Sequence, residues 1–240
     1  MNGDGTEARG KSGGEGGDQG GGEGLRERKK RLMRQQLSDT ATEMFMERGF
    51  DAVRVSEVAE ACGVSEKTVF NYFPTKESLI LDRWDGTIAS LRIGLADSGI
   101  PPVQAALQIL EQELRGMTYW LAAQDDPALA GASIRRFGDL YRSTPSLRTH
   151  QHEVVDRMSV VVAGLLAERA GMSPEDPEPQ IAATALLGLW QIQFQSLRKY
   201  LDGTLTPTQI HKAVTADVQR AARLLDAGLG SFATPTQDAV

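Results

Sequence analysis

Side chains that can read the edges of DNA bases are concentrated in one short segment, GVSEKTVFNYF (63–73). Lys67 can donate to guanine O6 and N7, Asn71 can pair with an adenine edge, and Thr68 can touch a thymine methyl or a phosphate. At helical spacing these side chains cannot point inward while Val69 does. Each of them alone could be an ordinary solvent-exposed residue, but the set together predicts contact with a DNA major groove.

The residues around this segment are those that a helix-turn-helix requires. Gly63 tolerates the positive φ of a tight turn, and Ala59 is small enough for two helices to cross closely. Ser65 is a good N-cap for the second helix. The turn is followed and preceded by valines at core spacing, namely Val58, Val64 and Val69. Cys62, beside the turn, is interpreted as a packing thiol rather than a redox sensor, since no basic group is evidently placed to activate it.

Several further groups are suited to the phosphate backbone. Tyr72 carries a hydroxyl, and the segment TKESL (75–79) is expected to open a helix whose free N–H groups and Lys76 form a phosphate site. The run RERKKRLMR (26–34) has six basic residues and one acidic residue, a net charge of +5. Such a run is often only a solvated helix face. Next to a helix-turn-helix, however, its side chains could reach phosphate or the minor groove; these are Arg26, Arg28, Lys29 and Lys30.

The stretch VSEVAEACGVSEKTVFNYFPTKESLI (55–80) resembles the DNA-binding domain of the TetR (tetracycline-repressor) family of bacterial regulators. The resemblance covers roughly residues 28–80, and the pattern GVSxxTxxxYFxxKExL (63–79) is its most specific part. It implies an all-helical, homodimeric transcription factor, usually a repressor. Three N-terminal helices would bind half of an operator. A variable C-terminal domain would bind a small inducer and dimerise through its last two long helices.

The resemblance assigns roles to individual residues. Positions on the recognition helix are Ser65, Lys67, Thr68 and Asn71, and the phosphate-contacting positions are Tyr72 and Lys76. Structural positions are Val58, Ala59, Gly63, Val69, Phe70 and Phe73. One residue departs from the family pattern, because Arg54 stands where a capping threonine is usual. Either Ser56 caps the helix one turn later, or Arg54 contacts phosphate by its charge.

Composition places limits on the other classes of protein. The chain has 240 residues, a formal net charge of −6 and one cysteine, which excludes an intramolecular disulfide or a cysteine-based metal cluster. The acidic charge argues against general affinity for nucleic acids but leaves room for a local basic surface. No apolar run reaches the length of a membrane span, and the N-terminus lacks the apolar region of a signal peptide. We therefore expect a cytoplasmic protein without membrane contact.

The pattern beyond the helix-turn-helix is helical almost throughout, so the predicted fold class is all-α. Helices are expected at 102–122, 127–142, 145–170, 178–201 and 207–229, most of them with a proline at or near the start. Four segments follow: a glycine-rich disordered tail (1–24), the DNA-binding domain (25–75), a helical ligand-binding and dimerisation domain (76–230) and a flexible C-terminus (231–240).

Aromatic residues are frequent in the C-terminal part and offer two interpretations. Each can be ordinary helix core, whereas the group together is typical of an apolar ligand pocket. The predicted lining residues are Trp120, Phe137, Tyr141, Trp190 and Phe194, with Gln191 as a polar contact. The segment 183–201 is apolar nearly all round, and 207–229 has a clean apolar stripe. These two segments either pack within one subunit or, as the resemblance implies, form a four-helix dimer bundle.

No catalytic or metal-binding pattern is present in the sequence. His150 and His152 are two residues apart and would point to different helix faces, so a metal pair is not expected, and His211 is expected to be exposed. No Ser/His/Asp set or glycine loop is readable. We therefore expect a non-enzymatic transcriptional regulator that needs no cofactor and binds operator DNA and a small-molecule effector. The alternative is an activator or a ligand-independent regulator of the same fold.

Overall fold

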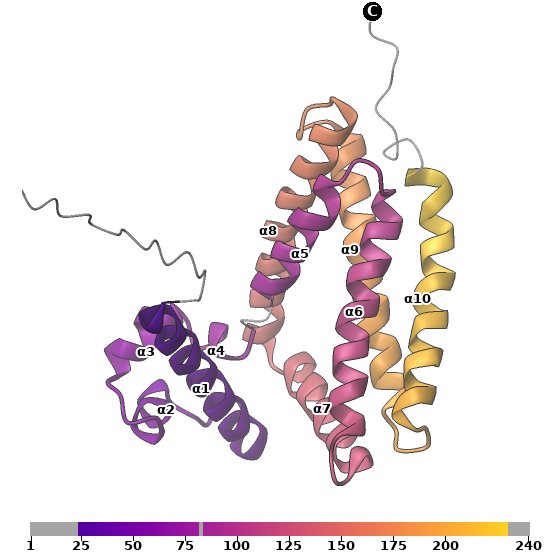
Figure 1. The fold of residues 1–240 in the computed structure, drawn as a ribbon. Helices are drawn as coiled ribbons and strands as arrows, with labels where there is room; N and C mark the ends of the chain where they lie inside the picture. Colours follow the sequence, from indigo (N-terminus) through magenta and orange to yellow (C-terminus); the bar gives the residue numbers. More distant parts are fainter. Residues whose placement is uncertain (1–23, 82–83, 230–240) are drawn as a thin grey trace, which may run out of the picture.

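A computed structural model describes residues 24–81 and 84–229, and helices are the only regular elements in these ranges (Figure 1). The all-α prediction is therefore confirmed. The predicted terminal segments lie almost wholly outside the described residues. The ten helices are α1 (Leu25–Arg48), α2 (Val55–Ala61), α3 (Glu66–Tyr72), α4 (Ser78–Leu81), α5 (Trp84–Ala96), α6 (Pro102–Ala122), α7 (Pro127–Ser143), α8 (Pro145–Ala170), α9 (Pro177–Tyr200) and α10 (Pro207–Leu229).

The first three helices and the short α4 enclose a small apolar core, which we call the first core. Its centre is formed by Phe45 of α1 and Phe73 after α3, both of which are almost fully buried. The guanidinium of Arg34 lies 4.7 Å from the Phe73 ring centroid and donates to the Tyr72 carbonyl at 2.9 Å. Because that carbonyl is at the end of α3, the positive charge is favourably placed against the helix dipole. These contacts hold α3 against α1.

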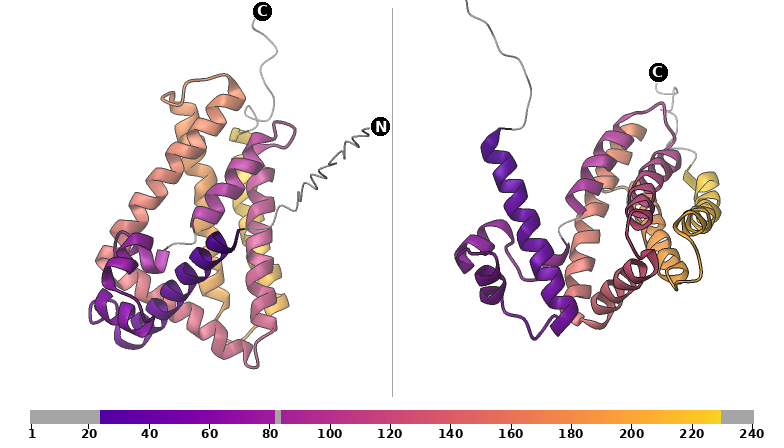
Figure 2. Two further views of the ribbon diagram at one scale, coloured as in Figure 1. Left: turned by 60° about the vertical axis from the view of Figure 1, so that its left-hand side comes forward. Right: turned by 60° about the horizontal axis from the view of Figure 1, so that its bottom comes forward.

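Helices α5, α6, α8, α9 and α10 stand side by side and enclose the larger second core (Figures 1 and 2). Its buried residues are mainly leucine, alanine and valine from all five helices. Proline occupies the first turn of α6, α7, α8 and α9, where a missing N–H costs no helical hydrogen bond. Arg169 of α8 donates to the carbonyls of Asp97 and Ile100, each at 2.8 Å, and so fastens the loop between α5 and α6.

The corner between α7 and α8 connects the two cores. Tyr141 and Leu147 from this corner are buried in the first core, while α8 from Val154 onward belongs to the second. Arg136 of α7 also donates to the Met46 carbonyl near the end of α1 at 3.2 Å. The helices of the first core are therefore attached to the rest of the chain through side chains of α7 and α8.

Candidate DNA-binding interface

The turn between α2 and α3 has the geometry that the sequence predicts. Gly63 adopts φ of 68°, in the left-handed region, and the Val64 N–H donates to the Ala59 carbonyl at 2.9 Å. Ser65 caps α3, since its hydroxyl accepts a hydrogen bond from the Thr68 N–H at 3.1 Å. The Thr68 hydroxyl lies 2.8 Å from the Ser65 hydroxyl. The two hydroxyls are thus hydrogen-bonded to each other, and in this structure they cap the N-terminus of α3.

One face of α3 is turned away from the first core and is made of Glu66, Lys67, Phe70 and Asn71, which we call the recognition face. Lys67 and Asn71 are four residues apart, so they are neighbours on the helix surface. Val69, on the opposite side, is 1% exposed and anchors the helix. Two of the side chains predicted to read bases, Lys67 and Asn71, are therefore exposed together on one surface, whereas Thr68 is half-buried beside Ser65.

Phe70 is part of the recognition face, although the resemblance assigned it a structural position. Its side chain is 43% exposed, because it lies three residues after Lys67 and not on the side of Val69. An exposed apolar ring next to Lys67 and Asn71 is suited to contact with a thymine methyl group.

The predicted backbone-contacting cations of the N-terminal run lie on the first turns of α1. Arg26, Arg28, Lys29 and Lys30 are all exposed, and the structure starts this helix at Leu25, before the run. The side of the molecule that carries α3 thus also carries the positive end of α1 (Figure 1). Tyr72 is half-buried at the end of α3.

Lys76 and the segment after Pro74 differ from the expected phosphate site. The Lys76 amine donates to the Phe50 carbonyl and lies 4.3 Å from the Phe50 ring centroid. Burial, the largest influence, lowers the pKa of this amine, which nearby carboxylates partly offset. Helix α4 begins only at Ser78, and the Thr75 and Ser78 side chains accept from each other's backbone N–H at 3.1 and 3.2 Å. Those two N–H groups are therefore not free for a phosphate.

The position of Arg54 resolves where α2 begins. The helix starts at Val55, so Ser56 lies within the first turn and the alternative in which Ser56 caps the helix is wrong. Instead the Glu57 carboxylate accepts from the Arg54 N–H at 2.7 Å and forms an ion pair with Arg48 at 2.7 Å. The hydrogen bond from Arg54, followed by that from Arg48, lowers the pKa of Glu57. The exposed Arg54 side chain remains directed to solvent.

The six predicted pocket residues do not form one wall. Phe137 and Tyr141 of α7 lie together in or against the first core, and Phe194 of α9 meets α7 where Gly138 permits close approach. Trp190 is buried in the second core and donates to Glu113 at 3.0 Å. Trp120 is 49% exposed at the end of α6, and Gln191 is exposed on α9. Sequence periodicity could not distinguish these directions, because both faces of α9 carry apolar residues.

The structure has two hollows of note in this half. One, of about 410 Å³, is polar and lined by Arg135, Gln195, Arg198, Lys199 and Asp202. The other, of about 490 Å³, lies between α6, α9 and α10. Neither is lined by any of the six predicted residues. Within the described ranges, no group of three or more histidine, cysteine or acidic side chains is placed to hold a metal ion.

Two helices joined by a tight turn, with polar side chains that can pair with base edges exposed on the second, define the helix-turn-helix of DNA-binding proteins. The sequence pattern of bacterial regulatory proteins of the tetR family matches residues 37–82, and that of the MftR C-terminal domain matches residues 121–230. The chain belongs to the TetR family of transcriptional regulators. None of its helices in the described ranges combines the length and apolar character that a bilayer span requires.

Curated relatives agree with this assignment. The chain is 30% identical over 165 residues to the HTH-type transcriptional regulator TcmR of Streptomyces glaucescens, which is 64% of this chain and 67% of TcmR. It is 24% identical over 153 residues, 64% of this chain and 73% of the relative, to a Mycobacterium tuberculosis protein proposed to be the mycofactocin biosynthesis regulator MftR. The structure of NalD, the secondary repressor of the MexAB-OprM efflux pump in Pseudomonas aeruginosa, covers 80% of this chain and 97% of its own, with 18% identity and a TM-score of 0.49.

Proposed function

We propose that this TetR-family regulator is a homodimeric, sequence-specific repressor that a small, mostly apolar ligand releases from its operator. The observation that carries the proposal is the recognition face of α3. It exposes a donor, an amide and an aromatic ring together, while Val69 and the Arg34 contact hold the helix in place. Such a face, with the cationic start of α1 beside it, has the chemistry that base edges and flanking phosphates require.

A dimer is supported by a mostly apolar stripe that α9 and α10 leave exposed or half-exposed. The stripe, which we call the outer stripe, consists of Ile181, Thr184, Gly188 and Ile192 on α9 with Ala221 and Leu224 on α10. Ile181 is 68% exposed and Leu224 is 83% exposed. Two copies related by a two-fold axis would cover this surface and present two α3 helices to half-sites about 34 Å apart or at a multiple of that distance.

The proposed release by a ligand is supported by the attachment of α1 to α7. A ligand that displaced α7 would move the first core with it, because Tyr141 and Arg136 both contact that part of the chain. The ligand acts only through its different affinity for the DNA-competent and the released states. One observation favours a ligand-independent regulator instead: the aromatic residues predicted to line a pocket are dispersed, and Trp190 already has a hydrogen-bond partner.

The test is the binding of the full-length protein to a fluorescently labelled fragment of its own upstream DNA, with unlabelled random DNA as competitor. We expect competitor-resistant binding that weakens steeply with salt, since each neutralised phosphate releases counterions. Binding no tighter than to random DNA, for this fragment and for sites selected from a random pool, would contradict sequence-specific recognition.

A further inference from the structure

A groove of about 490 Å³ runs between α6, α9 and α10, and its floor is apolar. The floor is formed by Leu107, Leu110 and Leu114 of α6 with Val218 of α10. Leu110, Leu114 and Val218 also belong to the second core, so the base of the groove is rigidly held. Its volume is within the range of small-molecule sites, and polar side chains such as Gln104, Gln108 and Gln219 surround the apolar floor.

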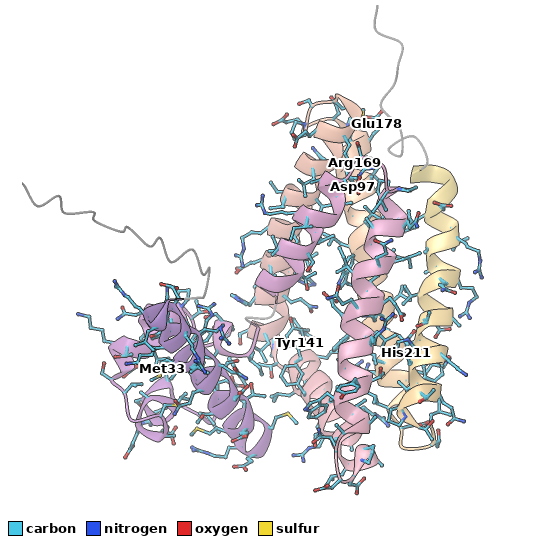
Figure 3. All side chains as sticks on the ribbon, viewed as in Figure 1. Met33, Asp97, Tyr141, Arg169, Glu178 and His211 are labelled. Carbon is cyan, nitrogen blue, oxygen red and sulfur yellow. The ribbon has the colours of Figure 1, made fainter. Side chains whose placement is uncertain are left out.

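The polar residues that flank the groove fasten α6 to α10. His211 of α10 lies with one ring nitrogen 3.0 Å from Glu111 and the other 3.2 Å from the Thr118 hydroxyl, and Thr215 donates to Glu111 at 3.3 Å (Figure 3, where His211 is labelled). Glu111 also accepts from Arg115 at 3.1 Å. The carboxylate of Glu111 is therefore already occupied by donors of the protein, and it is a structural tie rather than a vacant ligand contact.

Gln193 of α9 is different, because its amide lines the groove without a partner. Four polar residues are buried in the described part of the chain, and Gln193, at 7% exposed, is one of them. The other three make side-chain hydrogen bonds: Thr118, Thr144 and Ser196. Gln193 makes none within the described residues, and its amide borders the groove. The amide atoms of Gln193 are not among the fully buried side-chain atoms without a partner, so they keep contact with solvent beside the groove and can pair with water or a ligand.

We propose that this groove is a small-molecule site for a compact apolar or aromatic compound that carries one uncharged hydrogen-bonding group, such as a hydroxyl or an amide. The apolar body would lie on the leucine floor, and the polar group would pair with the Gln193 amide. An amide both donates and accepts, so it matches a neutral group of either kind. The site goes beyond the proposed function, since it is separate from all six aromatic and polar residues predicted to bind an effector.

Two small probes that differ by one hydroxyl test the site, namely p-cresol and toluene. They are titrated into the full-length protein with ¹³C-labelled leucine methyl groups, and NMR shifts are followed without DNA. We expect saturable shifts at Leu107, Leu110 and Leu114, and none at Leu91 or Leu166. The dissociation constant of p-cresol should be about three- to tenfold lower than that of toluene, the range that one net hydrogen bond supplies.

Two variants and one matched control locate the binding. Ala216 is exposed on α10 and lines the groove, so Ala216→Trp should fill the groove and abolish the shifts without disturbing the core. Ala132→Trp places the same side chain on an exposed alanine of α7, outside the groove, and should leave binding unchanged. Gln193→Leu should make the affinities for the two probes equal. Thermal unfolding of each variant is recorded first to establish that it is folded.

Four results would overturn the proposal. Three of them are the absence of shifts at the groove leucines, equal affinity of the wild-type protein for both probes, and shifts that persist in Ala216→Trp. Leucine shifts that respond to protein dilution but not to p-cresol would assign the groove to a second copy of the chain and would also overturn it. The titration contains no DNA, so a negative result would not contradict the proposed DNA binding. A failure of the DNA-binding test would likewise not contradict the groove site.

Discussion

At the scale of single residues, Phe70 and Asn71 are adjacent in sequence but should contribute differently to DNA recognition. Asn71→Ala removes a group that can pair with an adenine edge, and we expect a loss of about 1–3 kcal/mol in preference at one base position. Phe70→Ala should weaken preference for a thymine at a neighbouring position. The measurement is affinity for a panel of single-base operator variants.

The exposed Glu60 of α2 provides the control, since Glu60→Ala changes a surface residue outside the recognition face. It should leave the base preferences unchanged. If Asn71→Ala lowered affinity equally for the operator, its variants and random DNA, then Asn71 would not read a base.

Lys76 and Lys67 allow a matched comparison between a lysine whose amine is hydrogen-bonded within the protein and a lysine that is exposed to solvent. Lys76→Met removes the hydrogen bond to the Phe50 carbonyl and the contact with the Phe50 ring, so it should destabilise the fold by about 1–2 kcal/mol. Lys67→Met, on the exposed recognition face, should change stability by less than about 0.5 kcal/mol. Urea unfolding followed by circular dichroism measures both.

The two lysines should also differ in the salt dependence of DNA binding. If Lys76 acts by positioning the loop rather than by touching phosphate, Lys76→Met lowers affinity with little change in the salt slope. A slope reduced by about 1 would instead indicate a direct phosphate contact. Equal stability of both variants would contradict the structural role of the Lys76 amine.

The exposed polar residues of α3 could be predicted from sequence, because the helical spacing places polar residue types on the face opposite the buried Val69. The position of the Lys76 side chain could not be predicted in this way, since the carbonyl and the ring that it contacts belong to Phe50, 26 residues earlier in the sequence. Long lysine side chains can extend in several directions, and only tertiary structure selects one.

At the scale of the elements, two glycines in different backbone conformations should respond in opposite ways to alanine. Gly63→Ala forces a side chain into φ of 68° and should destabilise the protein by about 1–2 kcal/mol. Gly116 is exposed inside α6 with open space around its Cα, so Gly116→Ala should stabilise by up to about 1 kcal/mol. Thermal or urea unfolding measures both changes.

A neutral or stabilising Gly63→Ala would show that the turn can rearrange at no cost. The DNA affinity of this variant should fall together with its stability, because the turn sets the angle of α3. Gly116→Ala, far from α3 in the chain, should bind DNA as the wild-type protein does.

The helix boundaries were largely predictable because proline and glycine mark them. Helices α6, α8 and α10 have the predicted ends, and α9 is displaced by one residue at each end. The start of α2 was not predictable, since an arginine is not a capping side chain and the cap comes from Glu57, three residues later.

At the scale of the whole molecule, the outer stripe should hold two copies together. Ile181→Glu and Leu224→Glu place charges on surfaces that a partner would bury, and together they should convert a dimer into a monomer. Val160→Glu is the control, because Val160 is 74% exposed on α8, outside the stripe. Light scattering should give twice the 26.0 kDa chain mass for the wild type and the control, and 26.0 kDa for the double variant.

A wild-type monomer at micromolar concentration would contradict the homodimer. A double variant that stayed dimeric would place the interface elsewhere. Loss of DNA affinity in a monomeric variant with an unchanged α3 would link assembly to operator binding, as expected for two half-sites.

The arrangement of the regulatory half was less predictable than its helices. Aromatic residues at helical spacing indicate burial, but which neighbour they meet depends on how the helices cross. Trp190 and Gln191 are adjacent in sequence, yet one is buried against Glu113 and the other is exposed. The groove residue Gln193 could not be identified from the sequence. Its position beside the groove depends on how α6, α9 and α10 pack together.

Helix α8 has a consequence for cooperativity. It has 26 residues, about 39 Å at the usual rise per residue, and it contributes Leu147 to the first core and Met158 to the second. Because α8 belongs to both cores, unravelling this helix from one core would also expose apolar surface in the other core. The stabilities of the two cores are therefore coupled. Heat should then melt the described parts of the chain in a single calorimetric transition. A compound that stabilises only the second core should raise the melting temperature of the DNA-facing helices by the same amount.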